Sequence, residues 1–151
     1  MTEKFFRKAD SPLHVPESGP NGADAPSRAI YNAMGDDNIK AMLRDVYEKL
    51  GASAIAGMFP RELVRASEKS ALFFIGLLGG PPVYMQTYGP PRMRARHLPF
   101  RITEAHRREW LACFYAVLEH PERYQFPEEH LEGFKKFLDG FSGWMVNTEE
   151  G

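Results

Sequence analysis

The stretch YGPPRMRARHLPF, from Tyr88 to Phe100, places three arginines at alternate positions, then a histidine, and then a Leu-Pro step. Proline disfavours a helical conformation in the residue before it. Leu98-Pro99 therefore ends the local helix directly after His97 and restrains where that imidazole lies. A histidine in this setting is a surface group, part of a nucleic-acid-binding patch, or the ligand of a group that itself carries negative charges. The residues around it decide among these three.

The chain has 151 residues, a length that favours a single domain. Its formal net charge of −1 gives no overall preference for nucleic acid or for an acidic membrane. The charge is unevenly distributed, because residues 92–108 contain six arginines and only one acidic residue. An aromatic content of 13% suits a core that has flat surfaces to cover.

Cys113 is the single cysteine, so no disulfide can form within the chain and a reducing compartment is expected. The first ten residues lack the apolar stretch of a secretory signal, and the longest apolar run, ALFFIGLL, is too short to cross a bilayer. We expect a soluble, cytoplasmic protein without a membrane partner. Cys113 lies among apolar helical positions with no basic group nearby, which favours a packed hydrophobe over a catalytic nucleophile.

Apolar residues recur at intervals of three and four residues in four segments, as they do on one face of a helix. In the first segment, Asp36 or Asp37 is the predicted N-cap and Gly51 the stop. Thr103 is the predicted N-cap of the third. Residues 83–89 are compatible with a strand or a short helix, but no partner strand is predicted, so the expected fold class is all-α. The predicted helices cover about residues 36–50, 62–78, 104–120 and 131–145.

Residues from about 9 to 27 are rich in proline, glycine, serine and aspartate, which predicts a flexible or draped extension. The two phenylalanines of MTEKFF, before this stretch, are candidates to dock on the body of the protein. The expected organisation is an N-terminal extension over residues 1–27, one domain over residues 28–147 and a C-terminal tail over residues 148–151.

Other kinds of site have little support. No Gly-x-Ser-x-Gly motif occurs, and Gly79-Gly80 is not followed by the lysine of a phosphate-binding loop. The five histidines form no His-Glu-x-x-His pair, and one cysteine cannot build a thiolate zinc site. A nucleic-acid-binding patch made of the arginines in residues 92–108 remains open, although exposed aromatics are not interleaved among them.

Three features together favour one ligand for His97. The arginines before it suit the carboxylates of a bound group, the Leu-Pro step restrains the imidazole, and large aromatic residues lie on inward helical faces. Haem has a flat apolar ring, two propionates and an iron atom that takes one imidazole nitrogen, so it would use all three features.

Two longer segments carry a resemblance to a known family. They are LGGPPVYMQTYGPPRMRARHLPFRI, Leu78 to Ile102, and EAHRREWLACF, Glu104 to Phe114. Their order is Gly-Gly-Pro, a tyrosine, Arg-x-Arg-x-Arg-His-x-Pro-Phe, and Trp-Leu thirteen residues beyond the histidine. From about Ala29 to Val146 the chain resembles the group II truncated haemoglobins. The resemblance implies a truncated globin fold, a two-over-two helical sandwich around haem, here with an N-terminal extension and with residues 28–147 as the haem-binding domain.

The resemblance also implies roles for single residues. His97 matches the proximal iron ligand, while Tyr47 and Trp110 match the distal residues that hydrogen-bond to a bound diatomic ligand. Phe59 matches the aromatic that packs against the porphyrin, and Ala66 the small residue at the distal gate. The remaining predicted pocket residues are Ser70, Phe73 and Phe74, and the predicted propionate partners are Arg96 and Lys69.

Two positions depart from the family pattern. Ser70 falls where an apolar residue, often leucine, usually lies over the iron. Its hydroxyl would contact the ligand or admit water there, or else bond back to its own helix. Pro90 replaces the histidine that is common in the Gly-His-Pro turn, and we expect it to stiffen that turn without changing the haem chemistry.

The implied function is that of a haem b protein that binds dioxygen and other diatomic ligands. Its use would be redox chemistry with oxygen, nitric oxide or peroxide, or sensing. Nitric oxide dioxygenation or peroxidase-like turnover would need a reductant that the sequence does not identify. We expect a monomer or homodimer that binds no nucleic acid. The alternatives are a globin-fold interaction module without haem and a nucleic-acid-binding basic patch.

Overall fold

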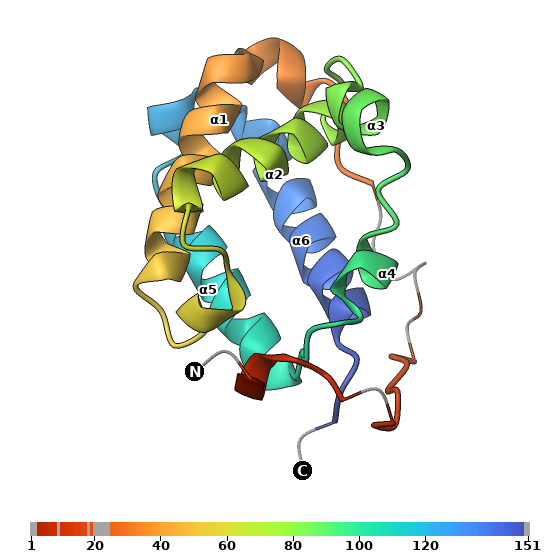
Figure 1. The fold of residues 1–151 in the computed structure, drawn as a ribbon. Coiled ribbons are helices and arrows are strands. Elements are labelled where there is room, and N and C mark those ends of the chain that lie inside the picture. The colour runs from red at the N-terminus through yellow and green to blue at the C-terminus, as the bar shows by residue number, and fades with distance from the viewer. Residues whose placement is uncertain (1–2, 9, 18, 20–24, 150–151) are drawn as a thin grey trace.

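The computed structural model describes residues 3–8, 10–17, 19 and 25–149. Within these ranges it contains helices and no strand, so the all-α prediction is confirmed (Figure 1). No helix in this part of the chain is both long and apolar enough to span a membrane. The α-helices are α1 (Ile30–Gly51), α2 (Leu63–Leu77), α3 (Val83–Tyr88), α4 (Met93–His97), α5 (Glu104–Leu118) and α6 (Leu131–Met145), and short 3₁₀ turns cover Glu3–Phe5, Ala56–Met58, Pro121–Tyr124 and Glu128–His130.

The four long helices form two layers. Helix α1 packs most extensively on α2, α5 packs on α6, and α1 also contacts α5. Figure 1 shows the orange α1 and yellow-green α2 in one layer, the α5 and α6 pair in the other, and the short α3 and α4 at one side. The predicted two-over-two arrangement is therefore confirmed. Large apolar side chains from three of these helices are almost fully buried between the layers, among them Phe114, Phe134, Leu43 and Leu138.

Helix α1 begins earlier than predicted. It starts at Ile30, six residues before the aspartate expected to cap it, and both Ile30 and Met34 are buried. Gly35 interrupts the helix with φ 77° and ψ 169°, a conformation that glycine adopts without steric cost. The apolar stripe therefore loses its phase at Gly35, which hides the first turn from helical periodicity. Asp36 lies directly after this break and not at the start of the helix, and its carboxylate accepts a hydrogen bond from the Tyr31 hydroxyl at 2.6 Å.

The Gly-Gly-Pro-Pro sequence ends α2, and its first glycine packs against the residues just before α1. Gly79 has φ 108°, and a methyl group on it would overlap the carbonyl oxygen of Arg28. Beside this contact, the amide of Tyr31 donates to the carbonyl of Leu78 at 3.0 Å. Glycine at position 79 is thus required by both its backbone conformation and the close approach of a second chain segment.

Helix α2 buries a wider face than its apolar pattern predicts. The residues fully buried against the rest of the fold are Ser67, Ala71, Phe74 and Ile75. Of the pocket residues predicted on this helix, Phe74 belongs to that buried set, whereas Ala66, Ser70 and Phe73 form a second, half-buried face. One helix therefore serves two purposes, packing on its neighbours with one face and lining a cavity with the other.

Two local predictions concern the segment between α2 and α5. Residues 83–88 are a helix, which decides between the two conformations that the sequence left open. Thr103 caps α5 as predicted: its side chain accepts a hydrogen bond from the amide of His106 at 3.3 Å.

One of the two N-terminal phenylalanines docks on the body. Phe5 is 3% exposed and belongs to the main core, whereas Phe6 remains 48% exposed and stacks on Phe100. Residues 1–2, 9, 18, 20–24 and 150–151 of the predicted extension and tail lie outside the described residues.

Candidate functional site

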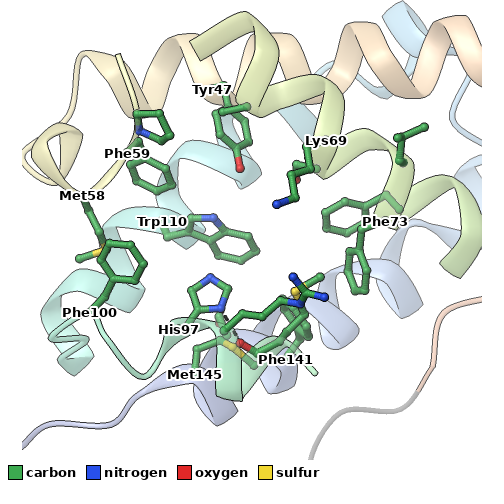
Figure 2. A pocket seen from close by; sticks show the side chains of 18 of the residues that line it. Tyr47, Met58, Phe59, Lys69, Phe73, His97, Phe100, Trp110, Phe141 and Met145 are labelled. Carbon is green, nitrogen blue, oxygen red and sulfur yellow. Dashed lines mark hydrogen bonds between the residues drawn. The ribbon is translucent and has the colours of Figure 1, made fainter. Parts of the chain in front are cut away.

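A cavity of about 720 Å³ lies between the two helical layers. Figure 2 shows its labelled side chains arranged around a central space, with Tyr47 and Lys69 on one side and His97 on the opposite side. All ten residues predicted for the site line this one cavity, although they come from five separate parts of the chain. They are Tyr47, Phe59, Ala66, Lys69, Ser70, Phe73, Phe74, Arg96, His97 and Trp110.

His97 is the last residue of the five-residue helix α4, and its ring nitrogen Nδ1 lies 2.6 Å from the carbonyl oxygen of Met93. A carbonyl only accepts hydrogen bonds, so Nδ1 carries the proton and Nε2 keeps a free lone pair. Burial lowers the pKa of His97, and the bond to Met93 acts in the opposite direction. The imidazole is therefore neutral at physiological pH and presents Nε2 to the cavity as a potential metal ligand.

Tyr47 and Trp110 bring polar groups to the same cavity from α1 and α5. Burial raises the pKa of the Tyr47 phenol, and a hydrogen bond with the Ser70 side chain acts in the opposite direction. The phenol thus remains protonated and able to donate. Figure 2 shows the Tyr47 hydroxyl directed into the central space, with the Trp110 ring between it and His97 in that view.

Aromatic rings form the walls. The Phe59 ring packs edge-on against Tyr47 with centroids 5.7 Å apart, and Phe73 stacks on Phe141 at 5.7 Å. Phe74 also borders the cavity, but it is only 3% exposed and packs mainly on Phe114 and Phe134, so it is chiefly a core residue.

Sequence reasoning missed part of the lining. Phe141 and Met145 lie on the apolar stripe of α6, but that stripe shows only that they face inward and not that a cavity lies there. Met93 lies one helical turn before His97, a spacing that could have identified its carbonyl as the partner of the ring. The cavity residues missed in this way include Met58, Met93, Phe100, Phe141 and Met145.

Both predicted propionate partners lie at the cavity, and each also has a contact within the fold. Arg96 lines the cavity, but its Nε and Nη2 donate to the carbonyls of Tyr88, Pro90 and Pro91 and so close the preceding turn. Lys69 lies at the cavity with its ammonium 4.4 Å from the centre of the Tyr88 ring. Two further cations that the sequence did not single out, Lys40 and Arg65, also line the cavity.

The basic run does not form one surface. Arg94 turns inward and donates to the carbonyls of Trp144, Val146 and His14, the last two at 2.9 and 2.7 Å. Arg107 pairs with Glu104 and with Asp139, at 2.9 and 2.6 Å. Alternate spacing in the sequence therefore does not produce a row of arginines facing one phosphate backbone, and the nucleic-acid hypothesis loses its main support.

Comparison with known proteins identifies the fold around this cavity. The model of the bacterial-like globin family matches residues 29–146. A curated relative, the group 2 truncated hemoglobin YjbI of Bacillus subtilis (strain 168), is 34% identical over 93 residues, which are 61% of this chain and 70% of that protein. The chain is a bacterial-like globin of the group II truncated haemoglobins.

Solved structures agree with this assignment. The phosphate-bound Hell's gate globin IV superposes on this globin with a TM-score of 0.78 at 35% identity, over 85% of this chain and 81% of that one. The group II truncated hemoglobin of Bacillus anthracis gives a TM-score of 0.72 at 28% identity, over 80% and 92% of the two chains. The truncated oxygen-avid haemoglobin of Bacillus subtilis gives 0.66 at 30% identity, over 78% and 98%.

Membership of this family implies haem as the bound group, and the residues of the cavity fit that group. The cavity volume lies within the range of about 300–1,000 Å³ that is common for cofactor sites. Its aromatic walls suit a flat apolar ring, the Nε2 of His97 suits iron, and the cations Lys40, Arg65 and Lys69 suit carboxylates. The cavity therefore has a suitable group for the porphyrin ring, for the iron and for the propionates.

Proposed function

We propose that this globin is a haem b protein that binds dioxygen and other diatomic ligands, with His97 as its proximal ligand and Tyr47 and Trp110 as its distal hydrogen-bond donors. One observation carries the proposal. A neutral imidazole with its Nε2 available and two polar aromatic donors, on three different helices, line the same apolar cavity.

Haem, when bound, supplies an iron site for a diatomic ligand together with one-electron redox chemistry. The chain supplies the rest. Because the Met93 carbonyl holds the proton on Nδ1 of His97, the other nitrogen stays deprotonated and ready to coordinate. The same hydrogen bond makes the imidazole a better electron donor.

On the distal side, Tyr47 and Trp110 would donate hydrogen bonds to the ligand through an O–H and an N–H group. A hydrogen bond to an acceptor with charged character contributes about 1.5–3 kcal/mol. Dioxygen would be the better acceptor of such hydrogen bonds, and carbon monoxide the poorer one. The two donors therefore select for polar ligands and slow their release, which suits sensing or redox turnover better than transport.

The remaining residues control access and polarity. Phe59 and Phe73 line the cavity with apolar surface that would keep water away from a bound haem ring. The small side chain of Ala66 would leave a path for the ligand into the distal side of the cavity. Ser70 is the polar exception, and its hydroxyl interacts with Tyr47. Lys40, Arg65 and Lys69 would pair with the propionates. Arg96 would join them, although its Nε and Nη2 also donate to backbone carbonyls.

Tight oxygen binding is supported by the similarity to the Bacillus subtilis protein that is described as oxygen-avid. A polar distal pocket also suits turnover of nitric oxide or peroxide, which requires a reductant to return the iron to its starting state. In such turnover the protein would need an unidentified reductant as a partner in addition to the diatomic ligand.

The absorption spectrum of the purified protein tests the proposal. We expect a stoichiometric Soret band, a histidine-ligated ferrous form after reduction with dithionite, and an oxygenated form on exposure to air. His97→Ala should lose the histidine-ligated form. His120→Ala, an exposed histidine outside the cavity, is the matched control and should keep it. A protein that stays colourless and takes up no added hemin would instead be an interaction module without haem.

A further inference from the structure

The segment that follows His97 is held by the N-terminus of the chain. Its backbone pairs with residues 5–7: the amide of Arg101 donates to the carbonyl of Phe5 at 2.6 Å, and the amide of Arg7 donates to the carbonyl of Pro99 at 2.8 Å. The two chain segments run antiparallel at this point. About ninety residues of sequence therefore separate partners that are directly bonded.

Side chains strengthen this pairing. Phe5 is 3% exposed and packs edge-on against His106, with ring centres 5.4 Å apart. The Nε of Arg7 donates to the carbonyl of Leu98 at 3.1 Å. The residue directly after His97 thus has its carbonyl bonded to a side chain from the N-terminal segment.

The C-terminal end of the domain holds the same segment from a second direction, through Asn147. This asparagine is fully buried. Its amide group donates to the carbonyls of Phe100 and His97, at 2.9 and 3.4 Å, and its Oδ1 accepts from the amide of Ile102 at 3.0 Å. The carbonyl of Asn147 in turn accepts from the amide of His14 at 2.9 Å, which links the two ends of the chain.

Helix α4 cannot position His97 without such help. It has five residues, and a helix of that length has no stability of its own in water. Proline at position 99 prevents the helix from continuing. Tertiary contacts must therefore set the position of the histidine backbone. They reach α4 itself, through its packing on α6 and through Arg94, and they reach residues 98–102, which follow it.

We propose that Phe5, Arg7 and Asn147 form a proximal clasp that positions His97 for coordination. These three residues contact residues 97–102 and His106 and do not line the cavity. The clasp acts through the backbone of His97, so its members are positioning residues. By limiting how far the imidazole can move from the cavity, it would hold Nε2 where a bound haem iron could take it as a ligand. This inference rests on the proposed role of His97.

The test compares Phe5→Ala and Asn147→Ala with wild type in the full-length haem protein. The main readout is the iron–histidine stretching band in the resonance Raman spectrum of the ferrous, ligand-free form. We expect this band to shift or broaden in both variants, and haem transfer to excess apomyoglobin to become at least tenfold faster. Phe5→Leu keeps an apolar side chain in the same place and should restore most of the wild-type behaviour.

Two controls separate positioning from a general loss of stability. Val15→Ala changes an exposed residue of the same N-terminal extension and should leave both readouts unchanged. Leu118→Ala removes buried side-chain volume at the end of α5, and should lower the melting temperature without moving the stretching band of the folded protein. Amide hydrogen exchange at residues 100–102 of the apoprotein should accelerate in the two clasp variants and not in Val15→Ala.

The possible outcomes are distinct. If wild type shows the band and both clasp variants retain it unshifted, the clasp does not position His97 and this inference is wrong, while the proposed function stands. If wild type binds haem without a histidine band, or if His97→Ala retains that band, both the role of His97 and the clasp are wrong.

Discussion

The Nδ1 of His97 and the carbonyl oxygen of Met93 are 2.6 Å apart, one helical turn from each other. This short contact selects one tautomer of the histidine and directs its free lone pair into the cavity. It needs no side chain from elsewhere, since the acceptor is the backbone of the same helix. The sequence of the surrounding residues can therefore vary without loss of the tautomer, provided that α4 forms and remains where the rest of the fold holds it.

Removing either distal donor should speed the release of dioxygen. Tyr47→Phe and Trp110→Phe each delete one hydrogen bond to the ligand, worth about 1.5–3 kcal/mol, which corresponds to an increase in the dissociation rate of about 10- to 100-fold. Stopped-flow displacement of dioxygen by carbon monoxide measures this rate. Tyr115→Phe is the control, because the Tyr115 hydroxyl bonds to the carbonyl of Lys135 outside the cavity. Unchanged rates in both distal variants would contradict the donor roles.

Ser70 should act on the ligand through Tyr47. The Ser70 hydroxyl lowers the pKa of the Tyr47 phenol against the effect of burial, so it makes Tyr47 a better donor. Ser70→Ala should therefore speed dioxygen release in wild type and have little effect in the Tyr47→Phe background. A double-mutant cycle on the dissociation rate should give a coupling of at least about 0.5 kcal/mol. Equal effects in both backgrounds would mean that Ser70 acts independently.

Gly79→Ala should strongly destabilise the protein. A methyl group there would overlap the carbonyl oxygen of Arg28, and the positive φ adds backbone strain, so we expect a loss of at least about 3 kcal/mol in the free energy of unfolding. Gly133→Ala is the matched control. Gly133 lies in α6, where a methyl group would meet open space, and alanine should stabilise the helix there by about 0.5–1 kcal/mol. Urea denaturation measures both.

Tyr124 should make stability depend on alkaline pH. Burial, followed by its hydrogen bond to the Asp45 carboxylate, raises the pKa of this phenol above its usual value of 10.0. Below pH 10 the phenol is protonated in both states and its contribution is complete. As the pH rises through 10, the unfolded chain loses the proton first, so the free energy of unfolding falls.

Tyr124→Phe should remove this part of the alkaline loss. At neutral pH the variant should be less stable by about 1 kcal/mol, because the hydrogen bond to Asp45 is lost. The difference between wild type and variant should then shrink as the pH rises from about 9 to about 11. Urea denaturation at these two values is the measurement, and a difference that stays constant would show that the phenol is not protected in the fold.

The differences between the predictions from the sequence and the structure have specific physical causes. The predicted start of α1 is too late because Gly35 shifts the phase of the apolar pattern without ending the helix. Arg96 also donates to three carbonyls of the preceding turn, a local use that the sequence did not indicate. The sequence places Arg94 in a basic run, whereas contacts with the C-terminal residues of the domain turn it inward.

Local sequence patterns were sufficient to predict those features of the fold that depend on neighbouring residues. Helical periodicity, the Thr103 cap and the Gly51 stop depend on residues within one or two turns, so the sequence by itself determined the all-α class and the positions of most helices. The motif around His97 likewise predicted an imidazole that lines the cavity. Its resemblance to a family then located the other nine predicted site residues, all of which line one cavity.

Only the tertiary structure decided how these parts are held. The pairing of residues 5–7 with residues 98–101, and of Asn147 with residues 97–102, joins segments that lie tens of residues apart. No local pattern predicts such contacts, because each depends on where the two layers of helices bring the chain ends. The backbone hydrogen bonds between residues 5–7 and residues 99–101 do not depend on side-chain type, and the side-chain bonds of Arg7 and Asn147 join residues far apart in the sequence, so neither kind leaves a local pattern.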